Sequence, residues 1–397
     1  MKDLTVVHLY PFFNRMGGIE KYLLDILPHQ KSRHELILVG GEFDEEVTGE
    51  YRTVKVGFLR RPRFLVSLSF SIAAQRAIGR LARLGQIRGR HCVLHAQGAS
   101  CFRQDVVTAH SCHKAWFLGS LREQKPFSWP WIRKLMNPVH YLTIAIETIQ
   151  YRPRNHRRII AISNCIKAEL IKHFGVNPDR ISVIHSGVDC ETYNPSGRET
   201  FRDPVRTRHG IPVDATVLCF VANEFRRKGL ATVVRAMAAA SNKRLHLLVV
   251  GRDDPAPFLG LISELGLSSR VHFTGPVRGV HEYYGASDIF VLPTLYEPFG
   301  LVITEAMAAG LPVITSKIAG AAELMTPGVD GILLEDPRDP KELASALDDL
   351  DAKLSRDEMG KHARETAVRQ RWEDVVERID GVYQDVLRGS AAGVIDA

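Results

Sequence analysis

The chain has 397 residues, 45% of them hydrophobic and 24% charged, with a formal net charge of +7. This length is too great for one ordinary core and favours two domains of about 200 residues each. The sequence contains no run of about 18 apolar residues, and its six cysteines form no C-x-x-C pair, so it indicates neither a membrane span nor a zinc site. The first residues, MKDLTVV, are typical of a strand and not of a signal peptide.

Short apolar runs alternate with helical stretches along the whole chain, and such runs are typical of parallel strands buried on both faces. The first half predicts strands at residues 4–9, 35–39, 92–95, 105–109, 158–162 and 180–184, with a helix over 163–173 capped by Ser163. The second half predicts strands at 216–221, 245–250, 271–274, 288–292 and 312–315. This alternation predicts an α/β fold of two doubly wound, Rossmann-like domains.

The domain boundary is expected in a polar stretch with three prolines. Residues 191–214 lack clear periodicity and read as a linker between a domain of residues 1–190 and one of residues 215–375. Helices alone are expected over 338–387, with Leu343, Leu347 and Leu350 on one face. Residues 376–397 are predicted to form a C-terminal helix that packs back on the first domain and ends in a frayed tail.

Positive charge is concentrated in the first half of the chain. Residues 51–158 hold 20 Lys and Arg but 3 Asp and Glu. One reading is a solvated basic face, and the other is a surface for an anionic partner. Nucleic acid is not expected, because no module of the common nucleic-acid-binding type is visible. An anionic membrane leaflet or a phosphorylated glycolipid fits better, since each Lys or Arg near such a leaflet contributes about 1 kcal/mol.

Residues 286–310, ASDIFVLPTLYEPFGLVITEAMAAG, form the most informative segment. A strand ends near Leu292 and a helix begins near Gly300, so Glu297 lies before the helix and Glu305 about one turn inside it. The N–H groups of residues 299–301 are left without helical partners and favour a phosphate. Flanking carboxylates suit the hydroxyls of a sugar or ribose. The alternative is a proline-containing loop with two surface glutamates.

This segment resembles the E-x7-E signature of family 4 retaining glycosyltransferases, which have the GT-B fold, and the chain is similar to lipopolysaccharide core glucosyltransferases. The likeness continues across nearly the whole chain. It implies two domains facing across a cleft. It also implies that Glu297 binds hydroxyls of the donor sugar and Glu305 those of the ribose. The backbone of Phe299, Gly300 and Leu301 would bind the sugar or the diphosphate.

A second segment carries cations at the end of another strand. Arg226, Arg227 and Lys228 precede Gly229, where a helix begins. Cations at this place suit the charge of a departing diphosphate, although three solvated side chains are the other reading. The resemblance assigns phosphate binding to Arg227 and Lys228. The family often has G-R a few residues upstream, where this chain has Ala222 and Asn223, so Arg226 is an open substitute for that contact.

Two segments of the first domain match the family pattern at strand ends. Gly17 and Gly18 open a helix, and a plain tight turn is the other reading of this pair. His110 follows the strand over 105–109, where a lone histidine is more often structural; His113 and, more weakly, His95 are rivals. The resemblance implies that the glycine backbone faces the donor phosphate. It places the histidine beside the sugar's 6-hydroxyl, at the reaction centre.

The segment VHFTGPVR, residues 271–278, resembles the strand and loop whose backbone reads the nucleotide base in this family. The resemblance assigns that role to Thr274, Gly275 and Val277. The one D-x-D motif, at Asp349 and Asp351, lies on a charged amphipathic helix, and no metal is predicted.

The predicted activity is transfer of a hexose, with retention, to a lipid-linked, lipopolysaccharide-type or polysaccharide acceptor. The donor is a nucleotide diphosphate sugar, with UDP-glucose favoured and no cofactor. We expect a cytoplasmic protein, peripheral on the inner face of the cytoplasmic membrane. A nucleotide-sugar epimerase, a soluble glycan synthase and a non-catalytic nucleotide-sugar-binding module are the alternatives, and the oligomeric state is open.

Overall fold

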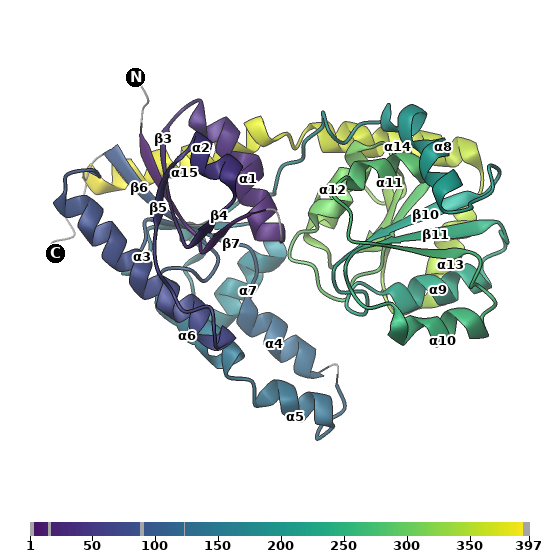
Figure 1. Cartoon of the computed structure of the whole chain (residues 1–397), viewed down its shortest axis with the longest axis horizontal. Coiled ribbons are helices and arrows are strands. Elements are labelled where there is room, and N and C mark those ends of the chain that lie inside the picture. The colour runs from purple at the N-terminus through teal and green to yellow at the C-terminus, as the bar shows by residue number, and fades with distance from the viewer. Residues whose placement is uncertain (1–3, 15–16, 88–90, 123, 392–397) are drawn as a thin grey trace. The chain divides into compact units, whose positions relative to one another are not determined.

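The computed structural model describes residues 4–14, 17–87, 91–122 and 124–391. The chain divides into two compact units (Figure 1). Unit 1 consists of residues 1–185 and 372–397, and unit 2 consists of residues 186–371. Among the described residues, no helix combines the length and the apolar character that a membrane span requires.

Unit 1 is built on a seven-stranded parallel sheet. Its strand order is β5-β3-β1-β6-β7-β8-β9. The strands are β1 (Thr5–Leu9), β3 (Glu35–Gly40), β5 (Arg52–Lys55), β6 (Cys92–Gln97), β7 (Val106–Ala109), β8 (Arg158–Ala161) and β9 (Ile181–Val183). A small separate sheet pairs β2 (Phe12–Phe13) with β4 (Glu42–Phe43). The central strands are buried because helices cover both faces of the sheet, and most of their residues are apolar.

The helices of unit 1 include the last helix of the chain. They are α1 (Gly18–Lys31), α2 (Glu45–Glu50), α3 (Val66–Arg83), α4 (His113–Arg122), α5 (Trp129–Leu135), α6 (Pro138–Gln150), α7 (Asn164–Phe174) and α15 (Trp372–Ala391). The predicted cap of α7 is confirmed, since Ser163 accepts a hydrogen bond from the N–H of Ile166 at 3.3 Å. Helix α15 packs against α1 and β8 of this unit, as Figure 1 shows in yellow.

Unit 2 holds a six-stranded parallel sheet in the order β12-β11-β10-β13-β14-β15. The strands are β10 (Thr216–Val221), β11 (Leu245–Val250), β12 (Val271–Gly275), β13 (Ile289–Leu292), β14 (Val313–Ser316) and β15 (Gly331–Leu334). The helices are α8 (Gly197–Arg208), α9 (Leu230–Ala239), α10 (Ala256–Glu264), α11 (Val280–Ala286), α12 (Leu301–Ala308), α13 (Pro340–Asp349) and α14 (Lys353–Val368). The two Rossmann-like units predicted from the sequence are confirmed.

Each sheet reverses its winding at one point. In unit 1 the chain winds outward through β1, β3 and β5, and then from β6 toward β9 on the other side. In unit 2 the change falls between β10 and β13. In open α/β sheets, ligands bind beyond the carboxyl ends of the strands at such a switch point. The loops after β1, β6, β10 and β13 are therefore the places where a site is expected.

The predicted linker at residues 191–214 is wrong. The segment contains α8 and belongs to unit 2, which begins at Ser186. Helix α8 buries few apolar side chains and is held mainly by charge: Arg198, Arg202 and Arg206 all donate to Asp288, at 2.7, 2.9 and 2.7 Å. A helix fixed by ion pairs has no apolar stripe, so hydrophobic periodicity did not reveal it.

Candidate functional site

The loops after β10 and β13 bring two oppositely charged side chains together in unit 2. These strands are neighbours, with Leu218 paired with Ile289, and their carboxyl ends meet at one edge of the sheet. Lys228, after β10, donates from Nζ to Oε2 of Glu297, after β13. The side chains are 9% and 14% exposed. The cation and the carboxylate singled out from the sequence thus form an ion pair at the switch point.

Burial lowers the pKa of the Lys228 ammonium, and the Arg227 charge acts in the same direction. The Glu224 charge raises this pKa, and the Glu297 carboxylate in contact with Nζ also supports the charged form. A bound anion such as phosphate would support it as well. This buried cation therefore favours an anionic ligand at the carboxyl edge of the sheet.

The two arginines before Lys228 differ in their surroundings. Arg227 donates to the Glu224 carboxylate and to the Tyr296 carbonyl, which ties the β10 loop to the β13 loop. Arg226 is exposed. The loop is also fastened to the β11 end, because the Phe225 N–H donates to Asp253 at 2.7 Å. Arg227 thus shapes the loop, and the side chain of Arg226 extends into solvent.

Helix α12 begins at Leu301, directly after Gly300. Gly300 has φ of +100°, and a Cβ there would lie 3.0 Å from Cγ of Glu297. The backbone of the preceding loop is held from the other side, since Gly320 donates to the Glu297 carbonyl at 3.0 Å and Ala321 to the Phe299 carbonyl at 2.8 Å. The first turn of α12 leaves N–H groups for a ligand. Gly320 was not singled out from the sequence.

Glu305 lies on α12 as predicted but is 4% exposed. Its Oε2 accepts a hydrogen bond of 2.9 Å from the Tyr284 hydroxyl of α11. The sequence analysis missed Tyr284, whose position on α11 carries no motif. The buried Tyr284 hydroxyl therefore fixes the orientation of the Glu305 carboxylate.

The residues predicted to read the base lie at the end of β12, the edge strand of the unit 2 sheet. Gly275 has φ of +72°, and the Gly251 N–H at the end of β11 donates to its carbonyl at 3.2 Å. The Thr274 hydroxyl also donates to that carbonyl, at 2.8 Å. Val277 follows in the loop. In the strand order, two strands separate β12 from β13, which leads to Glu297.

In unit 1, the predicted glycines lie beside the switch point at the start of α1. Gly17 is the N-cap residue, and a Cβ there would lie 2.3 Å from Oε2 of Glu20. Gly18 has open space around its Cα. Glu20 in turn accepts from the Tyr10 hydroxyl at 3.1 Å. A Cβ at Gly17 would therefore displace the Glu20 carboxylate, which lies at the flexible end of its side chain.

His110 follows β7 and is 8% exposed, and burial lowers its pKa to about 3. Its Nε2 bonds Oε1 of Gln97 at 2.9 Å. The rival His95 is fully buried and bonded at both ring nitrogens. The other rival, His113, bonds His140 at 3.0 Å. His110 therefore remains the predicted residue at the carboxyl edge of this sheet.

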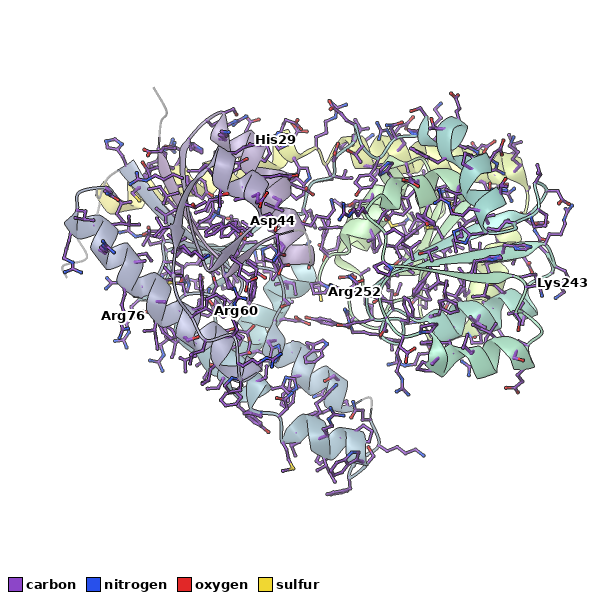
Figure 2. The ribbon with its side chains drawn as sticks, in the orientation of Figure 1. His29, Asp44, Arg60, Arg76, Lys243 and Arg252 are labelled. Carbon is purple, nitrogen blue, oxygen red and sulfur yellow. The ribbon has the colours of Figure 1, made fainter. Side chains whose placement is uncertain are left out.

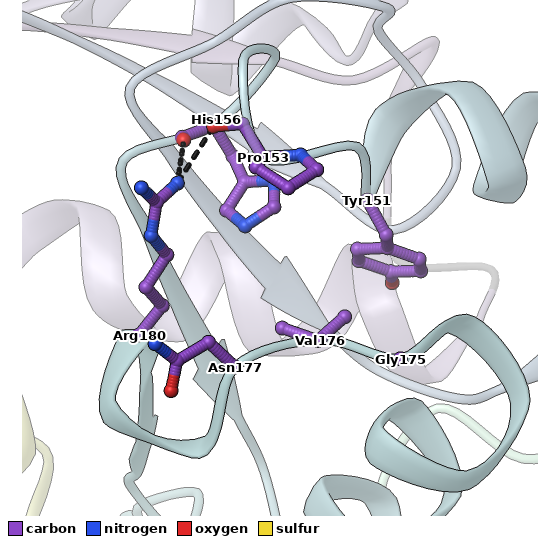
Figure 3. A pocket seen from close by; sticks show the side chains of 7 residues that line it. All are labelled: Tyr151, Pro153, His156, Gly175, Val176, Asn177 and Arg180. Atoms are coloured by element: carbon purple, nitrogen blue, oxygen red, sulfur yellow. Dashed lines mark hydrogen bonds between the residues drawn. The ribbon is translucent and has the colours of Figure 1, made fainter.

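A pocket in unit 1 lies away from these residues. Figure 3 shows its lining of Tyr151, Pro153, His156, Gly175, Val176, Asn177 and Arg180. His156 precedes β8 and Arg180 precedes β9, so this pocket lies at the amino edge of the parallel sheet, opposite the edge where His110 follows β7. Within the described ranges, no group of three or more His, Cys, Asp or Glu side chains is arranged to hold a metal ion.

Two protein-family models match this chain. The model of Glycosyltransferase Family 4 matches residues 16–192, and that of Glycosyl transferases group 1 matches residues 201–366. The chain thus carries a Glycosyltransferase Family 4 region followed by a Glycosyl transferases group 1 region, and both models describe glycosyltransferases. The first match lies mostly in unit 1, and the second lies entirely in unit 2.

Curated relatives of this glycosyltransferase include two named D-inositol 3-phosphate glycosyltransferases. The protein from Corynebacterium kroppenstedtii is 32% identical over 59% of this chain and 54% of its own length. The second, from Catenulispora acidiphila, is 32% identical over 58% of each chain. The aligned region thus spans a little more than half the length of these relatives.

Solved structures show the same fold. The glycosyltransferase WaaG, involved in lipopolysaccharide biosynthesis, has a TM-score of 0.76 at 21% identity, over 95% of this chain and 98% of its own. The sucrose-phosphate synthase from Thermosynechococcus elongatus has a TM-score of 0.74 at 22% identity, over 98% and 100%. The fold of this glycosyltransferase is GT-B.

Proposed function

We propose that this protein is a retaining, metal-independent hexosyltransferase that uses a nucleotide diphosphate sugar, with UDP-glucose favoured. The observation that carries the proposal is the Lys228–Glu297 pair beside the start of α12, at the switch point of unit 2. A cation, a carboxylate and the N-terminal end of a helix are together what a sugar diphosphate requires. The complex of the similar Anabaena HepE with UDP and glucose supports the choice of donor.

In this proposal, Lys228 neutralises the charge that develops on the diphosphate as the bond from sugar to phosphate breaks. The phosphate takes the place of Glu297 beside Lys228, and Glu297 then accepts hydrogen bonds from the sugar hydroxyls. Glu305, oriented by Tyr284, accepts from the ribose hydroxyls. The leaving phosphate takes the proton of the acceptor hydroxyl, so no carboxylate acts as a general base.

We propose that unit 1 takes the acceptor at an anionic membrane surface on the cytoplasmic side. Helices α4, α5 and α6 form an extension of unit 1 (Figure 1). Around α5 this extension exposes Phe127, Trp129 and Met136, which are 82%, 73% and 75% exposed. Lys125 and Arg133 are exposed beside them. Aromatic side chains among cations are typical of surfaces that enter the headgroup region of a bilayer.

The basic surface continues on α3, where Arg76, Arg80 and Arg83 are exposed. Figure 2 shows the labelled Arg76 on the outside of this helix. These cations strengthen attraction to an anionic leaflet without adding apolar area.

A second acceptor class is favoured by the curated relatives, whose names specify D-inositol 3-phosphate. A small phosphorylated polyol is anionic too, so the positive charge of unit 1 suits it as well. The two acceptors differ in their need for a membrane.

A transfer assay with the whole chain separates these possibilities. Labelled UDP-glucose is offered with a phosphorylated lipopolysaccharide-type glycolipid in vesicles, with D-inositol 3-phosphate, or with free glucose, each with EDTA. We expect label in the glycolipid, with the anomeric configuration retained and turnover undiminished by EDTA. Label in inositol phosphate supports the second class. An isomerised donor sugar without acceptor, or binding without product, refutes the transferase proposal.

Membrane docking is tested by sedimentation with vesicles. We expect binding to anionic but not neutral vesicles, weaker at about 500 mM than at about 50 mM salt because screening shortens the reach of charges. Trp129→Ala should weaken it. Leu354→Ala is the matched control, since Leu354 is 79% exposed but lies in unit 2. Equal binding by both variants, or binding that ignores salt, contradicts the proposed surface.

A further inference from the structure

Seven polar side chains form a continuous buried chain through unit 1. They come from β1, α1, β6, β7 and α15, and from the residue after β7: His8, Gln30, His95, Gln97, Thr108, Tyr383 and His110. All but His110 are fully buried, and His110 is 8% exposed. Polar groups in such a place must be satisfied by one another.

Near His110, the hydrogen bonds between these seven side chains all share one direction from donor to acceptor. Gln97 accepts from Nε2 of His110 at 2.9 Å, and its own amide nitrogen donates to Nδ1 of His8 at 3.4 Å. Nε2 of His8 donates to Oε1 of Gln30 at 2.7 Å. Each amide therefore accepts from one imidazole on the side nearer His110.

The same direction continues to the last helix. The Gln30 amide nitrogen donates to the Tyr383 hydroxyl at 3.0 Å, and that hydroxyl lies 2.6 Å from Nδ1 of His95, to which it can donate its own hydrogen. Nε2 of His95 then donates to the Thr108 hydroxyl at 2.8 Å. Six hydrogen bonds thus connect His110 to Thr108, which is two residues earlier in the sequence. The series passes through Tyr383 on α15.

This arrangement assigns one protonation form to all three histidines. The amide oxygens of Gln97 and Gln30 require a proton on Nε2 of His110 and His8, and a Tyr383 hydroxyl that donates onward places the proton of His95 on Nε2 as well. Burial lowers the pKa of His8 to about 4 and that of His110 to about 3, and it holds the pKa of His95 well below its ordinary value. Neutral rings can only donate at one nitrogen, so the orientation of each amide fixes the tautomer of its neighbour.

Turning over both glutamine amides and reversing every hydrogen bond gives a second satisfied arrangement. In that case His110 carries its proton on Nδ1. Mixed states leave an amide nitrogen facing a protonated imidazole nitrogen, or two acceptors facing each other, and either costs the desolvation of a buried polar group. The donor and acceptor roles of all seven side chains are therefore coupled to one another. A change at Tyr383 can reach His110 through Gln30, His8 and Gln97.

We propose that Gln97 is a positioning residue that holds His110 in its neutral Nε2–H tautomer, leaving Nδ1 as the acceptor presented to a ligand hydroxyl. Tyr383 on α15 links Gln30 to His95 and so joins the two parts of this hydrogen-bonded series. The role toward a ligand rests on the proposed function, in which His110 lies beside the donor sugar. The tautomer itself does not depend on that function.

The tautomer is measured by nitrogen-15 NMR of the imidazoles in the full chain at neutral pH. We expect protonated Nε2 and unprotonated Nδ1 at His110, His8 and His95. Tyr383→Phe removes one hydroxyl and keeps the ring, and we expect it to move the nitrogen shifts of His95 and His8. A wild-type His110 protonated at Nδ1, or a Tyr383→Phe variant with unchanged shifts, overturns the proposal.

Activity is measured with Gln97→Leu, which removes the acceptor from His110. We expect both tautomers of His110 to be populated and kcat to fall about tenfold, the effect of one hydrogen bond, with a smaller change in KM. Gln104→Leu is the control, because Gln104 is 4% exposed and its side-chain amide has no partner among the described residues. Wild-type turnover in Gln97→Leu overturns the positioning role. The predicted tautomers in a protein that transfers no sugar refute the proposed function and support the assignment.

Discussion

At the scale of single residues, the Lys228–Glu297 pair should act as one unit. We expect Lys228→Ala and Glu297→Gln each to lower kcat by about 100-fold or more, as loss of a charge-stabilising group does elsewhere. Residues that share one step are not additive, so the double variant should be little worse than the poorer single one. Steady-state transfer assays measure this.

Lys353→Ala, at an exposed position that begins α14, is the control for loss of one positive charge. Near wild-type turnover in the Lys228 variant, or full additivity in the double variant, would contradict the assignment of the pair.

A second residue-scale prediction concerns Asp288, which is 4% exposed and anchors α8. Burial alone would raise its pKa, but the Arg206 charge, the Val217 N–H and Arg202 outweigh burial and hold the pKa well below 3.8. The stabilisation from the carboxylate is therefore fully present above about pH 4 and is lost as the pH falls below that value.

We expect Asp288→Asn to lower the free energy of unfolding by about 3–5 kcal/mol at pH 7, as breaking one side of a buried ion pair does. The difference in the free energy of unfolding between this variant and the wild type should become smaller below pH 4. Urea unfolding at several pH values measures this, with the exposed Asp214→Asn as control. A gap that does not change with pH would argue against the charge as its cause.

At the scale of elements, the sequence predicts the buried strands well and the polar elements poorly. Continuous apolar runs located all eleven predicted strands, because a strand covered on both faces must be apolar. Strand β5 (Arg52–Lys55) was missed because it is a polar edge strand. Strand β15 was missed as well, although it is no shorter than β13. Helix α8 was missed because ion pairs replace an apolar stripe.

The candidate site could likewise be predicted only in part from the sequence. The motifs placed Glu297 and Lys228 at strand ends, but their contact follows from the pairing of β10 with β13, which no local pattern encodes. Tyr284 and Gly320 were missed because each acts through a neighbour from another element. Strand order, and not spacing along the chain, assembles the site.

Gly320 provides an element-scale prediction, because its short helical turn presses against the loop before α12. A Cβ there would lie 2.2 Å from the Pro298 carbonyl oxygen and 2.9 Å from Cα of Phe299. We expect Gly320→Ala to displace this loop and lower kcat at least about tenfold, since small misplacements of a site are costly. Activity and thermal unfolding are measured together.

Gly260→Ala on α10 is the control, since a Cβ there meets nothing within 4 Å. It should keep full activity and gain slight stability from its better helix propensity. Unchanged turnover in Gly320→Ala would show that the loop tolerates displacement.

At the scale of the whole molecule, the two units differ in charge. Residues 1–185 and 372–397, which form unit 1, carry a net charge of +10, whereas residues 186–371, which form unit 2, carry −3. A negative unit does not attract an anionic donor over long range, so donor affinity must come from local groups such as Lys228 and the start of α12. The positive unit can attract an anionic acceptor over long range. This difference fits a division in which unit 2 holds the donor and unit 1 the acceptor.

That division can be measured because all four tryptophans, Trp116, Trp129, Trp131 and Trp372, lie in unit 1. Tryptophan fluorescence therefore follows the unfolding of unit 1, while far-UV circular dichroism follows both units. UDP-glucose at about 100 times its Kd should stabilise the unit that binds it by about 2.7 kcal/mol. We expect the dichroism transition to shift upward more than the fluorescence transition, because the donor contacts proposed for unit 1 are few. A fluorescence transition that shifts as much or more would place the main donor contacts in unit 1 and contradict the role of the Lys228–Glu297 pair.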